Sequence, residues 1–193
     1  MKFKHLLLPA LLCAASVAHA GTVGAVSAGI QHADLGGLSL NQAVVSAQAQ
    51  TGSIVYGTQF ADGNHSGTDA RGLSASAGYA LDLKTPGLAI APSVSIGYSR
   101  LGGSAQKHLA GGATVGYTLP SSKLTVFGSG FAGRAFGTSG LYDSGAYTAA
   151  DAGAAYPIGP GFVSVDYAWS RSPETSGNHL VSRGVSLNYA ITF

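Results

Sequence analysis

The sequence is poor in charge, cysteine and long apolar runs, and each shortage excludes a class of protein. Only 9% of its 193 residues are charged, against roughly 25% in an ordinary soluble domain. Cys13 is the single cysteine, which excludes a disulfide framework and a cysteine-ligated zinc site. After the N-terminal segment no stretch reaches roughly 18 consecutive apolar residues, which excludes membrane-spanning helices.

The few charges are balanced. The formal net charge is +2, and it comes from Lys2 and Lys4. Without these two, the ten basic residues fall to eight, equal to the eight acidic residues. A chain without net charge lacks the excess of basic residues that attracts nucleic acid, so we expect no nucleic-acid partner. A hydrophobic content of 46% excludes disorder.

The first twenty residues have the three parts of a secretory signal peptide. Two lysines make a basic start, Leu6 to Ala15 is apolar, and Ala18-His19-Ala20 is a small-x-small cleavage site. The apolar part is too short for a bilayer, which takes roughly 20 residues. We therefore expect residues 1–20 to be cleaved after Sec-type export, and residues 21–193 to form a single domain.

Beyond this segment the hydrophobic pattern repeats every two residues. Apolar side chains alternate with Gly, Ala, Ser and other small polar residues, which is the period of a β-strand with two unlike faces. The alternation is clearest in Leu73 to Leu83, Leu88 to Tyr98 and Val181 to Phe193, and weaker in Thr22 to Ile30, Leu38 to Gln48 and Ser53 to Phe60.

Two classes of connection separate these stretches. Their alternation is typical of an up-and-down meander whose two ends face different surroundings. Counting strands gives about ten, which we favour; if residues 22–48 are instead a periplasmic extension or plug, eight remain. Tight turns are predicted at 84–87, 120–123 and 157–160, and longer polar loops at 61–70, 101–106, 137–144 and 172–178.

The polar face of the strands differs from that of a soluble β-sandwich, which would carry long charged side chains. Here it is built from Gly, Ala, Ser and Thr, and the charges concentrate between the strands. An apolar face without charged neighbours suits lipid, and hydrocarbon leaves no partner for the backbone of a sheet edge. The sequence therefore predicts an all-β, closed, antiparallel transmembrane barrel.

The aromatic residues favour the same interpretation, because they fall near the two ends of the predicted strands. Two aromatic girdles are typical of outer-membrane barrels. Near the tight turns lie Tyr79, Tyr117, Tyr156, Tyr189 and Phe193, and toward the longer loops lie Phe60, Tyr98, Phe136, Tyr147, Tyr167 and Trp169.

The C-terminal residues Tyr189, Ile191 and Phe193 resemble the terminal signature of bacterial outer-membrane proteins, in which a final Phe follows apolar residues at alternate positions. This resemblance implies delivery by periplasmic chaperones and recognition by the barrel-assembly machinery. We therefore expect the protein to lie in the outer membrane of a Gram-negative bacterium.

Four further stretches resemble a YfaZ-type family of small outer-membrane proteins, and more loosely barrels of the OmpA and OmpX type. The resemblance covers most of residues 52–193 and lies in the pattern of strands and turns rather than in an invariant motif. It implies an outer-membrane barrel and supplies no catalytic residues. The stretches are GLSASAGYAL (72–81), LAIAPSVSIGYSRL (88–101), VFGSGFAG (126–133) and AYTAADAGAAYPIGPGFVSVDYAWSR (146–171).

Acyl hydrolysis, which some outer-membrane barrels perform, would need a serine close to a histidine that an acidic or amide group orients. His179 and Ser182 are three residues apart and His65 and Ser66 are adjacent, so neither pair shares a strand face. We therefore expect no enzymatic activity and no cofactor. A lipid-modifying enzyme is a remote alternative.

The histidines of the mature chain fall in or beside the longer connections. If these connections converge at one mouth, the imidazoles could share zinc or copper with Asp34, Asp62 or Asp69 nearby. Alternatively, loops simply tolerate histidine better than lipid-facing strands do. The candidate ligands are His32, His65, His108 and His179.

Alternation directs Asp82, Asp151 and Asp166 toward the lumen, and Arg134 with them if Phe127 and Phe131 face lipid. Such charges are expected to pair in a hydrogen-bonded network. Alternatively, the small residues around them leave a narrow water path with a slight preference for cations.

Arg100, Arg171 and Arg183 have the lipid-facing parity near the longer loops. There they can bind lipopolysaccharide phosphates bidentately, or merely extend to the interface. We therefore expect a non-enzymatic outer-membrane barrel with a structural or surface-interaction role, whose partners are outer-membrane lipids including lipopolysaccharide. A narrow channel for small solutes is the alternative.

Overall fold

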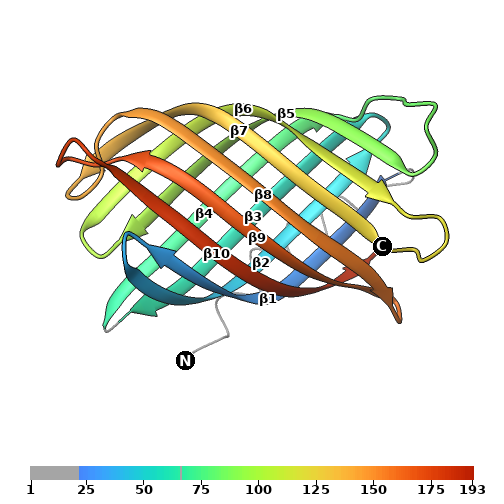
Figure 1. The fold of residues 1–193 in the computed structure, drawn as a ribbon, viewed down its shortest axis with the longest axis horizontal. Helices are drawn as coiled ribbons and strands as arrows, with labels where there is room; N and C mark the ends of the chain where they lie inside the picture. The colour runs from blue at the N-terminus through green and yellow to red at the C-terminus, as the bar shows by residue number, and fades with distance from the viewer. Residues whose placement is uncertain (1–21, 66) are drawn as a thin grey trace.

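The computed structural model describes residues 22–65 and 67–193, so the predicted signal peptide lies outside the described residues. Every strand is antiparallel to its neighbours, and β1 pairs with β10 to close the barrel (Figure 1). The ten strands are β1 (Thr22–Leu35), β2 (Leu38–Thr51), β3 (Ile54–His65), β4 (Thr68–Tyr79), β5 (Leu88–Leu101), β6 (Ser104–Thr118), β7 (Thr125–Ser139), β8 (Gly145–Ile158), β9 (Gly161–Pro173) and β10 (His179–Thr192).

The predicted fold class, a closed barrel of ten strands, is confirmed. Residues 22–48 belong to the barrel wall, because β1 pairs with both β10 and β2 along its length. The alternative of eight strands with a plug is therefore wrong. The described residues form no helix that is long and apolar enough to cross a membrane.

The barrel has two ends, which we name by the chain termini. Thr22 and Phe193 lie at the terminal end, together with connections 52–53, 80–87, 119–124 and 159–160. The far end, on the left in Figure 1, holds connections 36–37, 102–103, 140–144 and 174–178, and the turn between β3 and β4.

The expectation of long polar loops at one end is wrong, because strands continue through most of the predicted loops. At the far end, the β1–β2 and β5–β6 hairpins turn within two glycines each, Gly36-Gly37 and Gly102-Gly103. Gly36 and Gly102 have φ values of 58° and 56°, a conformation that glycine adopts without the steric cost that a Cβ atom brings.

Alternation places large apolar side chains on the outside and small ones in the lumen. On β5, Val94 and Ile96 are each 57% exposed on the outer face, while Ser93 and Ser95 point inward. Because these apolar residues cover the outer wall rather than a core, the surface matches hydrocarbon better than water.

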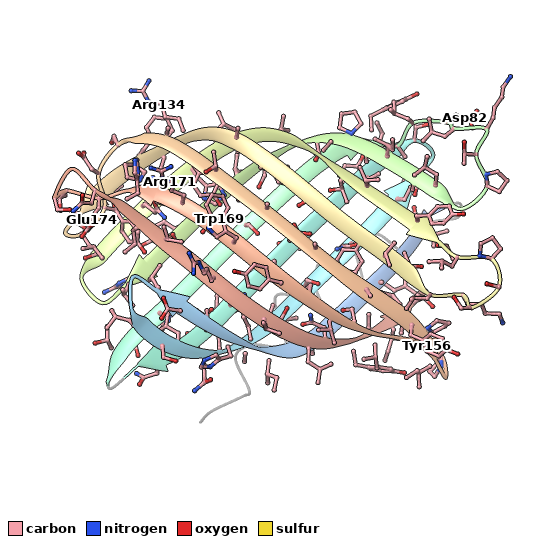
Figure 2. All side chains as sticks on the ribbon, viewed as in Figure 1. Asp82, Arg134, Tyr156, Trp169, Arg171 and Glu174 are labelled. Atoms are coloured by element: carbon pink, nitrogen blue, oxygen red, sulfur yellow. The ribbon has the colours of Figure 1, made fainter. Side chains whose placement is uncertain are left out.

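Phe127 and Phe131 break this pattern by pointing into the lumen. The Phe131 ring lies over Gly112 of β6, and the Phe127 ring lies over Gly153 of β8. Since these glycines leave room for the rings, the lumen accepts them, and the opposite parity turns Arg134 outward. Figure 2 shows Arg134 projecting away from the wall at the far end, so its predicted lumen position is wrong.

The aromatic residues lie at the two ends as predicted, with one exception. Tyr79, Tyr156 and Tyr189 are exposed on the outer wall near the terminal end, and Tyr98 and Phe136 near the far end. The exception is Tyr147, which points into the lumen and stacks on His108.

Candidate functional site

Residues 140–144, which we call the lid, fold over the far mouth of the barrel. The Leu141 amide donates a hydrogen bond to Ser104 Oγ at 3.0 Å, and the Thr175 amide donates one to the Leu141 carbonyl at 3.1 Å. Tyr142 forms a backbone bridge with Glu174. The lid is thus tied both to β6 and to the neighbouring connection, and Tyr142 is only 5% exposed.

An apolar cluster fills the mouth beneath the lid. Its buried members come from the far ends of β1, β2, β4 and β5, and two leucines pack against them. Together with Tyr142, this cluster gives the far end of the lumen a partly apolar lining. The buried members are Ala33, Leu40, Ala70 and Leu101, and the leucines are Leu35 and Leu141.

A cavity of about 170 Å³ lies among these residues and is lined on one side by Ser99, Gln106 and Ser172. Gln106 Nε2 donates to Ser99 Oγ and to Ser172 Oγ, each at 3.1 Å. Gln106 Oε1 is buried and has no hydrogen-bond partner among the described residues. Such an unpaired buried acceptor costs about 1–3 kcal/mol.

Burial raises the pKa of Tyr142, and a hydrogen bond with Ser99 lowers it by less. The phenol therefore stays protonated at neutral pH. Since burial disfavours the charged form, ionisation of Tyr142 would weaken the packing of the lid.

Two carboxylates face the middle of the lumen, as the alternation predicts. Asp166 accepts hydrogen bonds from Ser186 Oγ at 2.6 Å and from Asn188 Nδ2 at 3.0 Å, and Asp151 accepts one from Ser129. The third carboxylate, Asp82, is exposed on the connection 80–87, because β4 ends at Tyr79 (Figure 2). Its predicted lumen position is therefore wrong.

Five cations lie on the outer wall of strands β5, β6, β7, β9 and β10 near the far end, and we call them the cationic belt. Each is exposed, and none has a carboxylate within ion-pair distance in the described part of the chain. The belt consists of Arg100, Lys107, Arg134, Arg171 and Arg183.

Arg71 on β4 lies next to the belt but is not part of it, because it pairs with carboxylates. Arg71 Nε lies 3.0 Å from Asp62 Oδ1, and its Nη2 atom lies 3.9 Å from Asp69 Oδ2. On β5 to β10 the described acidic residues within the strands, Asp151 and Asp166, face the lumen instead. The acidic and basic side chains on the outward face of strands β5 to β10 are therefore all cations.

The predicted metal site does not form from the histidines whose side chains are described. His108 points into the lumen and stacks on Tyr147, whereas His32 and His179 lie on the outer wall of β1 and β10. His65 ends β3, and its side chain lies outside the described part. Strand alternation separates His108 from the two outer histidines, and the described residues contain no group of three or more His, Cys, Asp or Glu side chains that could hold a metal ion.

Sequence reasoning missed one cluster on the outward face of the first hairpin. His32 Nδ1 lies 2.8 Å from Asn41 Oδ1, and Ser39 Oγ lies 3.3 Å from His32 Nε2. The register follows from the two-residue turn, which places His32 directly opposite Asn41. The Gly36-Gly37 pair between apolar residues was the signal that could have fixed this register.

No protein-family model and no curated protein matches this chain, but solved structures do. The outer membrane protease OmpT from Escherichia coli is 11% identical over 89% of this chain and 96% of its own, with a TM-score of 0.53. The fold is that of an outer-membrane β-barrel. At this identity the likeness shows the fold alone, and the YfaZ-type resemblance stays a prediction.

Two other solved structures are similar to this chain. A bacterial polysaccharide outer membrane secretin is 14% identical over 81% of this chain, with a TM-score of 0.50, and this chain spans 57% of its length. Neisserial surface protein A is 13% identical over 90% of this chain and 98% of its own, with a TM-score of 0.44.

Proposed function

We propose that the protein is an integral barrel of the Gram-negative outer membrane with a structural or surface-interaction role, and that it binds phosphate-bearing lipids of the outer leaflet. The cationic belt is the observation that carries this proposal. It occupies five of the six strands from β5 to β10, and the strands themselves present no outward carboxylate there to neutralise it.

The position of the belt suits lipid phosphate. Lys107 lies opposite Tyr98 and Phe136, and Arg183 lies opposite Trp169, so these two cations stand beside interfacial aromatic residues. Aromatic side chains of this kind mark the headgroup level in membrane barrels. Arginine binds phosphate through two parallel N–H donors, which favours phosphate over a simple counter-ion.

Binding of the refolded barrel to vesicles containing lipid A tests the belt. We expect the triple variant Lys107→Gln, Arg134→Gln, Arg171→Gln to bind much more weakly, by roughly tenfold, or about 1.4 kcal/mol, for each cation removed. The matched variant Lys84→Gln, Lys123→Gln removes two exposed cations at the terminal end and is expected to bind normally. Equal loss in both variants would show non-specific charge attraction and contradict the proposal.

A narrow channel is the second candidate, supported by the polar lumen. Inward-facing Gln48, Gln50 and Gln59 are exposed, so the half of the barrel near the termini holds water. The lid and its apolar cluster lie at the far end of this lumen and favour a barrel that does not conduct. We expect no unit conductance from the barrel in planar bilayers, whereas a steady unit conductance would favour the channel.

A further inference from the structure

The cluster on the first hairpin has the order of contacts that activates a serine. The His32 ring donates from Nδ1 to the Asn41 amide oxygen at 2.8 Å, which leaves a lone pair on Nε2. Ser39 Oγ lies 3.3 Å from His32 Nε2, on the opposite edge of the ring, and can donate to it when the ring is neutral. Hydroxyl, imidazole and an orienting acceptor therefore follow one another, as nucleophilic catalysis by serine requires, and contacts slightly longer than ideal are common before substrate binds.

We propose that Ser39, His32 and Asn41 form an acyl-transfer centre that hydrolyses acyl esters of phosphate-bearing lipids. Ser39 is the nucleophile, His32 the general base and acid, and Asn41 the positioning residue. The sequence predicts no enzyme because its nearest Ser–His pairs do not share a face. The hairpin instead joins Ser39 to a histidine seven residues away, across two strands.

The surroundings of this centre select a lipid substrate. All three side chains are exposed on the outer wall near the far end. Toward the middle of the wall, Ile30 is 69% exposed and lies opposite Leu187 of β10, which is 49% exposed. Toward the far end, Arg183 lies opposite Asp34.

A lipid whose acyl chains run along Ile30 and Leu187 would present its ester region to Ser39 and its phosphate to Arg183. This substrate assignment rests on the proposed function, since it requires the outer wall to lie in the outer leaflet. The centre itself does not depend on the rest of the cationic belt.

The reaction balances with water as the only co-reactant. Ser39 Oγ attacks the ester carbonyl carbon while His32 Nε2 takes the hydroxyl proton. The carbon–oxygen bond to the lipid alcohol then breaks, and His32 returns the proton to that alcohol, which leaves an acyl group on Ser39. Water next attacks the acyl carbon, His32 takes its proton and passes it to Ser39, and a free fatty acid departs.

A fluorophosphonate probe tests the nucleophile without any lipid. The probe is added to the refolded barrel in detergent, and the modified peptide is identified by mass spectrometry. We expect labelling of Ser39 that is lost in Ser39→Ala and falls roughly 100-fold in His32→Ala. Ser121→Ala removes an exposed serine of connection 119–124 and is expected to label normally. Absence of an adduct on Ser39 in a correctly folded barrel would overturn the proposal.

Fatty-acid release tests the substrate class. Vesicles of phosphatidylethanolamine and phosphatidylglycerol form one arm, and vesicles containing lipid A the other, so that the source of the ester is distinguished. We expect release in at least one arm, abolished by Ser39→Ala. No release above Ser39→Ala in either arm overturns the assignment of a lipid substrate.

Variants of Asn41 distinguish a positioning role in catalysis from a purely structural role. Asn41→Ala is expected to lower kcat roughly 100-fold with little change in KM, whereas Asn41→Asp keeps an acceptor for His32 and restores most of the rate. Equal loss in both variants overturns the role of Asn41. The fluorophosphonate reaction needs no lipid, whereas lipid A binding tests the cationic belt, so failure of the centre and failure of the cationic belt are distinguishable.

Discussion

The His108 ring on β6 stacks on the Tyr147 ring on β8, with ring centroids 4.3 Å apart and planes 10° from parallel. The two strands are not neighbours, since β7 runs between them. The rings meet across β7 because its inward residues at this level are Gly133 and Ala135, and Ala135 is 0% exposed. Small residues on the middle strand thus let two flanking strands interact directly through the lumen.

Replacing His108 by Ala removes this contact and is expected to lower the free energy of unfolding by about 0.5–1.5 kcal/mol beyond the loss of buried area. Urea unfolding of the refolded barrel measures it. His179→Ala removes an exposed histidine of the outer wall and is the control. If both variants lost the same stability, the stacked pair would contribute nothing specific.

Gly153 is expected to tolerate no side chain. A Cβ atom there would stand 2.6 Å from the Phe127 ring and 2.6 Å from the Val165 carbonyl oxygen. Gly153→Ala should therefore destabilise the barrel by about 1–3 kcal/mol, the usual cost of overpacking. Gly130→Ala on β7 meets no atom within 4 Å and should change the urea midpoint little. Comparable losses in the two variants would show that only strand propensity had been altered.

The lid is expected to open at alkaline pH. Burial raises the folded-state pKa of Tyr142 above its ordinary value of about 10. A raised pKa means that the contribution of Tyr142 to stability is fully present below pH 10 and is lost as pH rises through the folded-state pKa. The difference in phenolate absorbance between the unaltered protein and Tyr142→Phe should show one tyrosine titrating later than exposed ones. A difference curve centred at or below pH 10 would contradict the buried lid.

Deletion of Phe193 is expected to weaken the seam that closes the barrel. The Gly24 amide donates to the Phe193 carbonyl at 3.0 Å, and the Phe193 amide donates to the Gly24 carbonyl at 2.9 Å. Loss of both bonds should cost about 2 kcal/mol and slow assembly into the membrane. Heat-modifiable mobility on gels reports the folded fraction, with Phe193→Tyr as the control that keeps both bonds. Unchanged assembly after deletion would remove Phe193 from the predicted assembly signal.

Much of the fold was predictable because the face to which a side chain points is a local property of a strand. The backbone reverses side-chain direction at every residue, so Val94, Ile96 and Leu187 could be assigned to the outer wall from alternation alone. The count of ten strands followed from the same period, and Arg100, Arg171 and Arg183 stand on the outward face for the same reason.

Alternation gives two faces but does not say which face of a strand is the lumen. On β7 that choice was decided by Gly112 and Gly153 on the neighbouring strands, which leave room for Phe131 and Phe127 inside and so turn Arg134 outward. Tyr147 faces the lumen for a comparable reason, because the inward residues of β7 beside its ring, Gly133 and Ala135, are small.

What the sequence determined by itself was the barrel, its apolar outer wall and its polar lumen of small residues, because strand period and composition act within a few residues. What only the tertiary structure decided were contacts between strands: the lid over the far mouth, the cationic belt and the alignment of Ser39 with His32 and Asn41. These contacts depend on strand register and on closure of the barrel. The two-glycine turn fixes the register of β1 against β2, and the pairing of β1 with β10 closes the barrel. Neither property is encoded in a local sequence pattern.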